Sequence, residues 1–328
     1  MSEALLRVEN LKVHFPVTEG IMRQKQVDTI KAVDGVSFEI RRGETFGLVG
    51  ESGCGKSTTA LSILRMQEAS AGTIYLDGED ITHYNEAQLR SVRPRVQMVY
   101  QDPFSSLDPR MKVRDLIGEP LVVHKTTRDR IEYREKVAEL MDLVGLLPEM
   151  IDRYPHEFSG GQRQRIGIAR ALALEPELLI CDEPVSALDV SIQAQVVNLM
   201  MDLQERLGLT YLFIAHDLSV VRHISNRVGV MYLGKMVEVA ERDELFRNPQ
   251  HPYTQALLDA VPTPDPEREA GREHTLISGE VPSVRNPPPG CAFHPRCEQV
   301  MQRCREERPT LIQTDSGAHT ACHLYTQE

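Results

Sequence analysis

Residues 50–57 read Gly-Glu-Ser-Gly-Cys-Gly-Lys-Ser, a glycine-rich pattern that ends in a lysine and a serine. Glycines in such a loop let backbone N–H groups turn toward phosphate oxygens, and the positive end of a following helix strengthens the attraction. Lys56 is then placed to reach the β- and γ-phosphates, and Ser57 to offer its hydroxyl to Mg²⁺. The pattern therefore predicts a nucleoside triphosphate site. Its predicted contacts are Gly50, Glu51, Ser52, Gly53, Cys54, Gly55, Lys56, Ser57 and Thr58.

A pair of acids follows a second apolar run, Leu-Leu-Ile-Cys-Asp-Glu at residues 178–183. Asp182, at the tip of a predicted strand, suits the coordination of Mg²⁺. Glu183 beside it can take a proton from an attacking water molecule as a general base. Many strands end in acidic turns, so it is the phosphate loop upstream that favours a hydrolytic role for this pair.

A serine followed by two glycines, at residues 159–161, opens a predicted helix. The serine hydroxyl and the N–H groups at the start of that helix predict a second anion site, with an ordinary helix N-cap as the alternative. The position of the segment, 20 residues before the acidic strand, decides between the two. With these residues the chain resembles the ATP-binding subunits of ABC transporters. Their signature Leu-Ser-Gly-Gly-Gln stands here as residues 158–162, with phenylalanine replacing leucine.

Three further segments match the same family in the same order. Gln101 corresponds to the glutamine that senses Mg²⁺ and the membrane subunit, and residues 186–189 (Ser-Ala-Leu-Asp) to the loop that crosses the dimer interface. His216 corresponds to the switch histidine near the γ-phosphate. The resemblance covers about residues 5–250 and implies that two subunits sandwich two ATP molecules. Each ATP would then lie between the phosphate loop of one subunit and the signature segment of the other.

The resemblance implies a role for each matched residue. Glu183 and His216 would be catalytic, and Ser57, Gln101 and Asp182 would hold Mg²⁺. The adenine would stack on Phe15, for which a place in the core is the alternative. The signature residues that would act in trans are Ser159, Gly160, Gly161 and Gln162, and the predicted interface-loop residues are Ser186 and Asp189.

Composition and charge bound the possible partners. The chain has 328 residues, a formal net charge of −11, and 41% hydrophobic residues. The negative charge disfavours non-specific nucleic-acid binding. The N-terminus lacks an export signal and no apolar run is long enough to span a bilayer, so a cytoplasmic location against a membrane protein is expected. In such a compartment the six cysteines are expected to be free thiols or metal ligands rather than disulfides.

Alternating strand and helix patterns predict an α/β fold with a parallel sheet. The resemblance implies a P-loop ATPase core with an N-terminal antiparallel β region and a helical subdomain, and the tail adds a small Cys-rich extension. We predict an ATPase domain at residues 1–250, with a helical subdomain at about 102–172, and an extension at 251–328. Residues 16–29 are polar without periodicity and predict an extended loop. The other predicted elements are strands at 5–8, 11–15, 36–40, 45–49, 72–78, 178–181 and 211–215, and helices at 57–66 and 130–146.

Four of the six cysteines lie in the proline-rich tail, separated by five, six and seventeen residues: Cys291, Cys297, Cys304 and Cys322. Such a segment is too small to fold on its own core, and thiolates suit either zinc or an iron–sulfur cluster. The spacing lacks the close cysteine pairs of structural zinc sites and resembles a tail that can hold a [4Fe–4S] cluster. Zinc, with His294 or His323 as further ligands, and unmetallated thiols are the alternatives. Cys54 and Cys181 have no expected metal role.

The tail resembles the peptide-importer ATPases (the oligopeptide, dipeptide and nickel uptake group) at residues 251–258, 279–282 and 287–291, as does the segment 101–110. The resemblance implies an ATP-hydrolysing subunit of a peptide importer. Its partners would be a second, related ATPase chain, two permease subunits and an extracytoplasmic solute-binding protein. A soluble ABC ATPase of DNA repair or translation, or a regulatory iron–sulfur protein with a vestigial ATPase, are the other readings. The solute and the choice between homodimer and heterodimer stay open.

Overall fold

The computed structural model describes residues 3–19, 25–102, 105–260 and 279–326, and the chain divides into two compact units. The first unit comprises Met1–Leu5, Arg41–Glu44 and His83–Ala215. The second comprises Leu6–Ile40, Thr45–Thr82 and His216–Glu328. Both the phosphate loop and the cysteine-rich tail belong to the second unit.

Three parallel strands form the sheet of the first unit: β6 (Val96–Val99), β7 (Leu178–Asp182) and β8 (Thr210–Ile214). Every residue of β7 and β8 is buried, as continuous apolar runs in a parallel sheet require. The register pairs Asp182 with Ile214, which brings the acidic end of β7 level with the end of β8. The strands predicted at 178–181 and 211–215 are confirmed within one residue at their ends.

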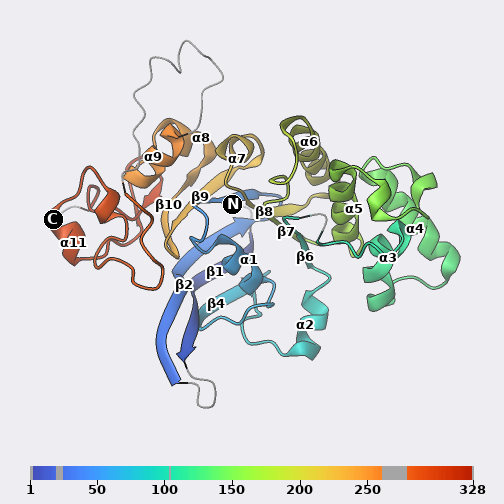
Figure 1. Cartoon of the computed structure of the whole chain (residues 1–328), viewed down its shortest axis with the longest axis horizontal. Coiled ribbons are helices and arrows are strands. Elements are labelled where there is room, and N and C mark those ends of the chain that lie inside the picture. The colour runs from blue at the N-terminus through green and yellow to red at the C-terminus, as the bar shows by residue number, and fades with distance from the viewer. Residues whose placement is uncertain (1–2, 20–24, 103–104, 261–278, 327–328) are drawn as a thin grey trace, which may run out of the picture. The chain divides into compact units, whose positions relative to one another are not determined.

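Helices α3 (Val113–His124), α4 (Arg130–Leu143) and α5 (Gly160–Leu172) pack against one another in the first unit (Figure 1). Buried apolar side chains from each helix join them, among them Ile117, Val137 and Ile166. The helix predicted to reach residue 146 ends at 143, because Gly145 takes a positive φ that reverses the chain. The remaining helical elements of this unit are α2 (Glu86–Val92), η1 (Pro148–Met150), η2 (Pro155–Glu157) and α6 (Val190–Leu207).

The N-terminal sheet has the order β2-β1-β4-β5, with antiparallel pairing of β1 with β4 and of β4 with β5. Its strands are β1 (Ala4–Glu19), β2 (Lys25–Arg41), β4 (Ala71–Leu76) and β5 (Glu79–Asp80). The strands predicted at 5–8 and 11–15 are one strand, with an irregular register between Glu9 and Lys12. The N-terminal antiparallel region predicted from the sequence is confirmed.

The prediction of an extended loop at residues 16–29 is wrong where the structure describes that segment. Strand β1 continues to Glu19 and β2 starts at Lys25, while residues 20–24 lie outside the described part of the chain. β1 and β2 are neighbours in the sheet, so their backbone groups hydrogen-bond to each other whatever the side chains. Hydrophobic periodicity therefore missed two strand ends that long-range pairing maintains.

The second unit also carries a mixed sheet, ordered β11-β12-β10-β9-β3. β3 (Thr45–Val49) runs parallel to β9 (Arg227–Tyr232), whereas β9 and β10 (Lys235–Glu241) form an antiparallel hairpin. Leu233 and Gly234 turn this hairpin with positive φ at both positions, which suits the right-handed twist of the strands. The expectation of a purely parallel main sheet is therefore corrected to a mixed one.

The tail is tied into that mixed sheet. β12 (His319–Thr320) pairs antiparallel with β10 and β11 (Ile312–Gln313) pairs with β12, so residues far along the chain extend the sheet. Ala318, Thr320 and Ala321 are buried there. Within the described residues of the second unit, the helical elements are α1 (Lys56–Ile63), α7 (Leu218–Ile224), α8 (Arg242–Arg247), α9 (Pro252–Asp259), η3 (His294–Arg296) and α11 (Gln302–Glu306).

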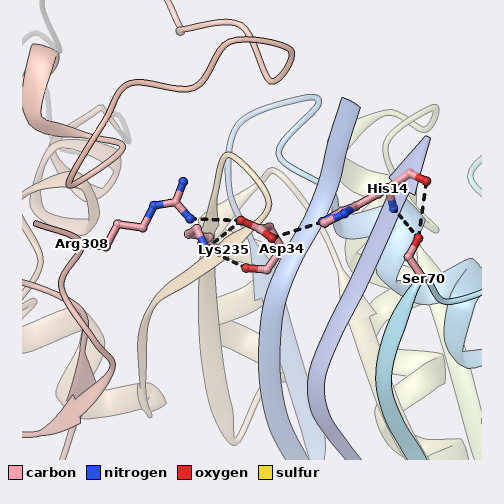
Figure 2. Close-up of polar contacts among 5 residues, drawn as sticks. All are labelled: His14, Asp34, Ser70, Lys235 and Arg308. Atoms are coloured by element: carbon pink, nitrogen blue, oxygen red, sulfur yellow. Dashed lines mark hydrogen bonds and ion pairs between the residues drawn. The ribbon is translucent and has the colours of Figure 1, made fainter. Parts of the chain in front are cut away.

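A partly buried carboxylate joins the tail to both sheets of the second unit (Figure 2). Asp34 on β2 accepts from Lys235 Nζ of β10 at 3.1 Å, from Arg308 of the tail at 3.1 Å and lies 3.2 Å from His14 Nε2 of β1. Ser70 Oγ in turn accepts from the backbone N–H of His14. Burial alone would raise the pKa of Asp34, but the hydrogen bonds from Lys235, Arg308 and His14 outweigh it and lower the pKa to about 2.

Replacing Asp34 with asparagine should destabilise the second unit at neutral pH. The lowered pKa means that the charge of Asp34 stabilises the fold above its ordinary pKa of about 4, and that this contribution disappears as the pH falls toward 2. We expect Asp34→Asn to cost about 2 kcal/mol and to lower Tm at pH 7 by about 4 °C.

Calorimetric unfolding at pH 7, 5 and 4 measures this effect. The difference in Tm between wild type and Asp34→Asn should be constant at pH 7 and 5 and begin to shrink at pH 4. Asp202→Asn, a replacement of an exposed aspartate on α6, is the matched control and should leave Tm unchanged. Equal Tm values for wild type and Asp34→Asn at pH 7 would contradict a stabilising role of the Asp34 charge.

Candidate functional site

The predicted phosphate loop connects the buried strand β3 to helix α1. Gly50, Gly53 and Gly55 have φ values of 148°, 78° and 107°, a region that residues with a Cβ rarely adopt. A Cβ on Gly50 would lie 2.2 Å from the carbonyl oxygen of Met231, and one on Gly55 would lie 2.3 Å from that of Ala32. Neither backbone can yield to a methyl group, so these two positions require glycine for the loop to close.

Lys56 is the first residue of α1, and its side chain folds back over the loop. The residue is buried, and its Nζ donates to the carbonyl oxygens of Gly50 at 2.7 Å and Glu51 at 3.2 Å. The N-cap Gly55 offers no side chain to the first N–H groups of the helix. A helix N-terminus with a glycine-rich approach and a lysine over it suits an anion such as a triphosphate. The residues present therefore fit the predicted nucleotide.

In the first unit, the structure brings together Gln101 and Glu183, two residues to which the family resemblance assigned roles. Gln101 Nε2 donates to Glu183 Oε2 at 2.9 Å. Glu183 follows β7 with a φ of 47° and donates its backbone N–H to Ile214 on β8. Asp182, the last residue of β7, is buried. A left-handed backbone at a non-glycine residue is uncommon, and here it turns the chain directly after the strand.

The signature segment forms the predicted helix start. Ser159 is the N-cap of α5, and its hydroxyl accepts from the backbone N–H of Gln162 at 3.3 Å. Gln162 Oε1 accepts in return from the N–H of Ser159, which completes a capping box. A Cβ on Gly161 would lie 2.4 Å from Cγ2 of Ile192 on α6, so glycine lets the two helices approach. The sequence predicts an ordinary helix N-cap as the alternative to an anion site at Ser159, and the structure contains this N-cap.

The predicted interface loop is held by its own polar groups. Ser186 Oγ donates to the carbonyl oxygen of Glu183 at 3.0 Å. Asp189 is the N-cap of α6 and accepts from the N–H of Ile192 at 3.1 Å. Gln193 on α6 donates to the carbonyl oxygens of Val185 and Leu188. This loop therefore starts at the acidic end of β7 and ends at a capped helix.

The predicted site residues divide between the two units. The first unit holds Gln101, the signature residues, Asp182, Glu183 and the interface loop. The second holds Phe15, the phosphate loop and His216. Phe15 is half-buried on β1, and His216 is exposed at the residue before the N-cap of α7.

All six cysteines lie in the described part of the chain, and none of them forms a disulfide. In the tail, the backbone N–H of Cys291 donates to the carbonyl oxygen of Cys304 at 2.8 Å, which brings these two segments together. Burial raises the pKa of Cys291, Cys297 and Cys322, that of Cys322 to about 12, and nearby cysteine thiols raise each further. Among the described residues, no group of three or more His, Cys, Asp or Glu is arranged to hold a metal ion.

Two residues that sequence reasoning assigned no role, Tyr253 and Arg296, contact the phosphate loop, and a third, Tyr232, contacts Arg296. Tyr253 accepts a hydrogen bond from the backbone N–H of Glu51 at 2.9 Å, and Arg296 donates two hydrogen bonds to the Glu51 carboxylate. Tyr232 accepts from the same guanidinium. Tyr253 lies in the segment 251–258 that resembles peptide-importer ATPases, but that resemblance assigned it no role. No local sequence signal relates Arg296 to a residue 245 positions earlier.

Comparison with protein families matches two regions of the chain. Residues 33–186 match the ABC transporter family, and residues 237–304 match the C-terminal region of oligopeptide and dipeptide transporters. Within the described residues, no helix is both long and apolar enough to span a bilayer.

Similar proteins cover nearly the full chain. It is 55% identical over 325 residues to the oligopeptide transport ATP-binding protein AppF of Bacillus subtilis, covering 99% of this chain and 98% of that protein. It is 53% identical to the oligopeptide transport ATP-binding protein OppF of Salmonella typhimurium, covering 94% and 93%. It is 49% identical to the dipeptide transport ATP-binding protein DppF of Haemophilus influenzae, covering 97% and 96%.

A solved structure has the same fold. A dimeric ATP-binding cassette in a post-hydrolysis state, bound to ADP and Pi, is 26% identical with a TM-score of 0.64, covering 72% of this chain and 98% of that one. Together with the glycine-rich loop, the capped signature helix and the acidic end of β7, these matches place the chain in the ABC transporter family, among the ATP-binding proteins of oligopeptide and dipeptide transporters.

Proposed function

We propose that this chain binds and hydrolyses ATP to drive the import of oligopeptides or dipeptides across a membrane. The observation that carries the proposal is the combination, on one chain, of a glycine-rich phosphate loop with the C-terminal region of peptide transporters. The near full-length similarity to oligopeptide transport ATP-binding proteins supports it. The C-terminal match favours import over a role in DNA repair or translation.

In this proposal the loop from Gly50 to Thr58 binds the triphosphate, and Lys56 leaves the carbonyl oxygens of the loop to contact the β- and γ-phosphates. Glu183 takes a proton from a water molecule, whose oxygen attacks the γ-phosphorus as the bond to the leaving ADP breaks. Gln101 orients the Glu183 carboxylate through the hydrogen bond described above. His216 contacts the γ-phosphate.

Mg²⁺ would be held by Ser57, Gln101 and Asp182, and when bound it neutralises charge on the phosphate oxygens. The adenine would stack on Phe15. Phe15 is half-buried on β1, which is compatible with a contact to a ligand.

We further propose that the complete ATP site needs a second subunit. Ser159, Gly160, Gly161 and Gln162 would contact the γ-phosphate held by the partner, and Ser186 and Asp189 would line the dimer interface. The partner would be a related ATPase chain, and two permease subunits and an extracytoplasmic binding protein would complete the complex. The chain would then act peripherally at the cytoplasmic face of the membrane. We place the ATPase domain at residues 1–250, its helical subdomain at about 102–172, and the extension at 251–328.

We also propose that Cys291, Cys297, Cys304 and Cys322 hold a [4Fe–4S] cluster, with zinc as the alternative. The donor set fits in its chemistry, because thiols suit an iron–sulfur cluster, and Cys291, Cys297 and Cys322 lie close enough to other cysteines for these to raise their pKa. The described residues do not yet stand in the arrangement of a bound metal, so the four thiols would have to draw together when a cluster binds. The raised pKa values of Cys291, Cys297 and Cys322 imply that these thiols are protonated without a metal, so binding must release protons. The backbone hydrogen bond between Cys291 and Cys304 supports the closeness of two donors.

Replacing the proposed general base should separate binding from hydrolysis. Glu183→Gln keeps the hydrogen bond capacity toward Gln101 but cannot take a proton, so we expect kcat to fall by about 10²–10⁴-fold. Binding of Mg-ATP should stay within a few-fold of wild type. Phosphate release by the assembled complex and equilibrium binding measure the two. Glu205→Gln, at an exposed position on α6, is the control, and near-normal turnover by Glu183→Gln would refute the assignment.

A double variant separates the proposed contact of Gly161 with the γ-phosphate from its packing against Ile192. Gly161→Ala should abolish most ATPase activity, since its Cβ would collide with Ile192 and would also obstruct a γ-phosphate. Adding Ile192→Ala removes the collision but not the obstruction. We expect the double variant to recover its Tm while its ATPase activity stays low. Recovery of activity together with Tm would mean that Gly161 serves helix packing alone.

Metal analysis of anaerobically purified protein tests the tail. We expect about four iron and four sulfide per chain, with broad visible absorption that disappears in Cys322→Ser, while Cys54→Ser retains it. One zinc per chain without sulfide would support the zinc alternative. Protein with neither metal, after reconstitution with iron and sulfide has also failed, would refute both.

A further inference from the structure

A bidentate ion pair between Arg296 and Glu51 connects the tail to the phosphate loop. Arg296 donates from one guanidinium nitrogen to Glu51 Oε2 at 2.9 Å and from the other to Oε1 at 3.1 Å. Such paired hydrogen bonds fix direction as well as distance. The Arg296 side chain is only 6% exposed, against 25% for Glu51, so the contact is shielded from solvent on the arginine side.

Arg296 depends on Glu51 for the compensation of its charge. Its guanidinium lies 6.0 Å from the ring centre of Tyr232 and donates a longer hydrogen bond, 3.4 Å, to the Tyr232 hydroxyl. Its buried Nε has no hydrogen-bond partner among the residues that the structure describes. A buried charge that loses its partner destabilises the fold, so breaking the pair between Arg296 and Glu51 is unfavourable. This ion pair therefore holds the loop and the tail together.

The backbone of Glu51 is hydrogen-bonded to the part of the loop that would bind phosphate. Its carbonyl oxygen accepts from Lys56 Nζ at 3.2 Å and from the N–H of Cys54 at 3.2 Å. Its own N–H donates to the Tyr253 hydroxyl. Holding the Glu51 side chain therefore also fixes the peptide groups around which Lys56 and the loop N–H groups are arranged.

Packing alone does not fix the loop at this point. Residues 51–54 line a cavity of about 250 Å³, whose other walls are Tyr232, Leu233 and the tail residues 281–284. Side chains at the wall of a cavity lack packing partners on that side, unlike those in a close-packed interior. The ion pair and the Tyr253 hydrogen bond, together with the hydrogen bond from the Gly234 N–H to the Cys54 carbonyl oxygen, therefore hold the loop on this side.

The base of Arg296 is itself anchored. Phe293, one turn earlier, is buried, and its ring centre lies 5.4 Å from that of Tyr232 and 5.4 Å from that of Tyr253. The backbone N–H of Arg296 donates to the carbonyl oxygen of Phe293. Aromatic contacts of this kind hold a short segment in one orientation. Arg296 therefore reaches Glu51 from a backbone that is held by aromatic residues of the tail, β9 and α9.

We propose that Arg296 is a positioning residue for nucleotide binding, which holds the phosphate loop through Glu51 in the conformation that receives the triphosphate. The inference rests on the ATP site assigned under the proposed function. It gives the extension a direct part in that site, and it makes nucleotide affinity sensitive to the order of the segment from Cys291 to Cys297.

Arg296→Met tests the proposal in the full chain, since methionine fills the space without a buried charge. We expect the Kd for Mg-ATP and the KM of the ATPase to rise about tenfold, because one lost hydrogen-bonded charge pair is worth about that factor. The kcat at saturating ATP should change by less than about threefold. Arg305→Met, at an exposed tail arginine, is the control and should leave Kd, KM and kcat unchanged.

A double-variant comparison shows whether the effect passes through Glu51. Arg296→Met should weaken ATP binding in wild type and add nothing in the Glu51→Gln background, because the contact is already broken there. Arg296→Lys keeps the charge but loses the paired geometry, so its Kd should lie between those of wild type and Arg296→Met; it serves if Arg296→Met does not fold.

Three outcomes would overturn the inference: an unchanged Kd in a folded Arg296→Met, a loss confined to kcat, or full additivity with Glu51→Gln. The proposed function fails separately, if wild-type protein binds no ATP or the assembled complex does not hydrolyse it.

Discussion

The carbonyl oxygens of Met231 and Ala32 lie where side chains on residues 50 and 55 would have to stand. This steric constraint governs the phosphate-loop site of the second unit. The loop packs against β2 and the end of β9, and it can do so only with glycine at both positions. The backbone then places Lys56 at the head of α1, with its Nζ over the loop carbonyl groups. A strand, a glycine turn and an uncapped helix end thus become an anion site by geometry rather than by a large set of charged side chains.

The extension beyond residue 250 belongs structurally to this same site. Tyr253 of α9 receives the N–H of Glu51, Arg296 holds its carboxylate, and Arg308 reaches Asp34 on β2. β12 adds a further strand beside β10. A tail that contacts the loop, the N-terminal sheet and the mixed sheet cannot be reordered without effect on the nucleotide-binding part of the unit.

Much of this could be predicted from short sequence windows. The strand at 45–49 and the capped helix after Ser159 depend on local apolar runs and capping residues, and both were found at or near their boundaries. The polar strand ends at 16–19 and 25–29 were missed, because pairing with a neighbouring strand maintains them. The β9–β10 hairpin made the main sheet mixed, and no motif had pointed to it. The contact of Arg296 with Glu51 joins residues 245 positions apart, and nothing local encodes it.

Backbone hydrogen exchange, read residue by residue with and without Mg-ATP, tests the central claim most directly. If the loop N–H groups hold the phosphates, the amides of residues 52–57 should become strongly protected when ATP is added, while those of the exposed outer face of α4 should not change. Unchanged exchange at the loop, under conditions where ATP is shown to bind, would contradict the account.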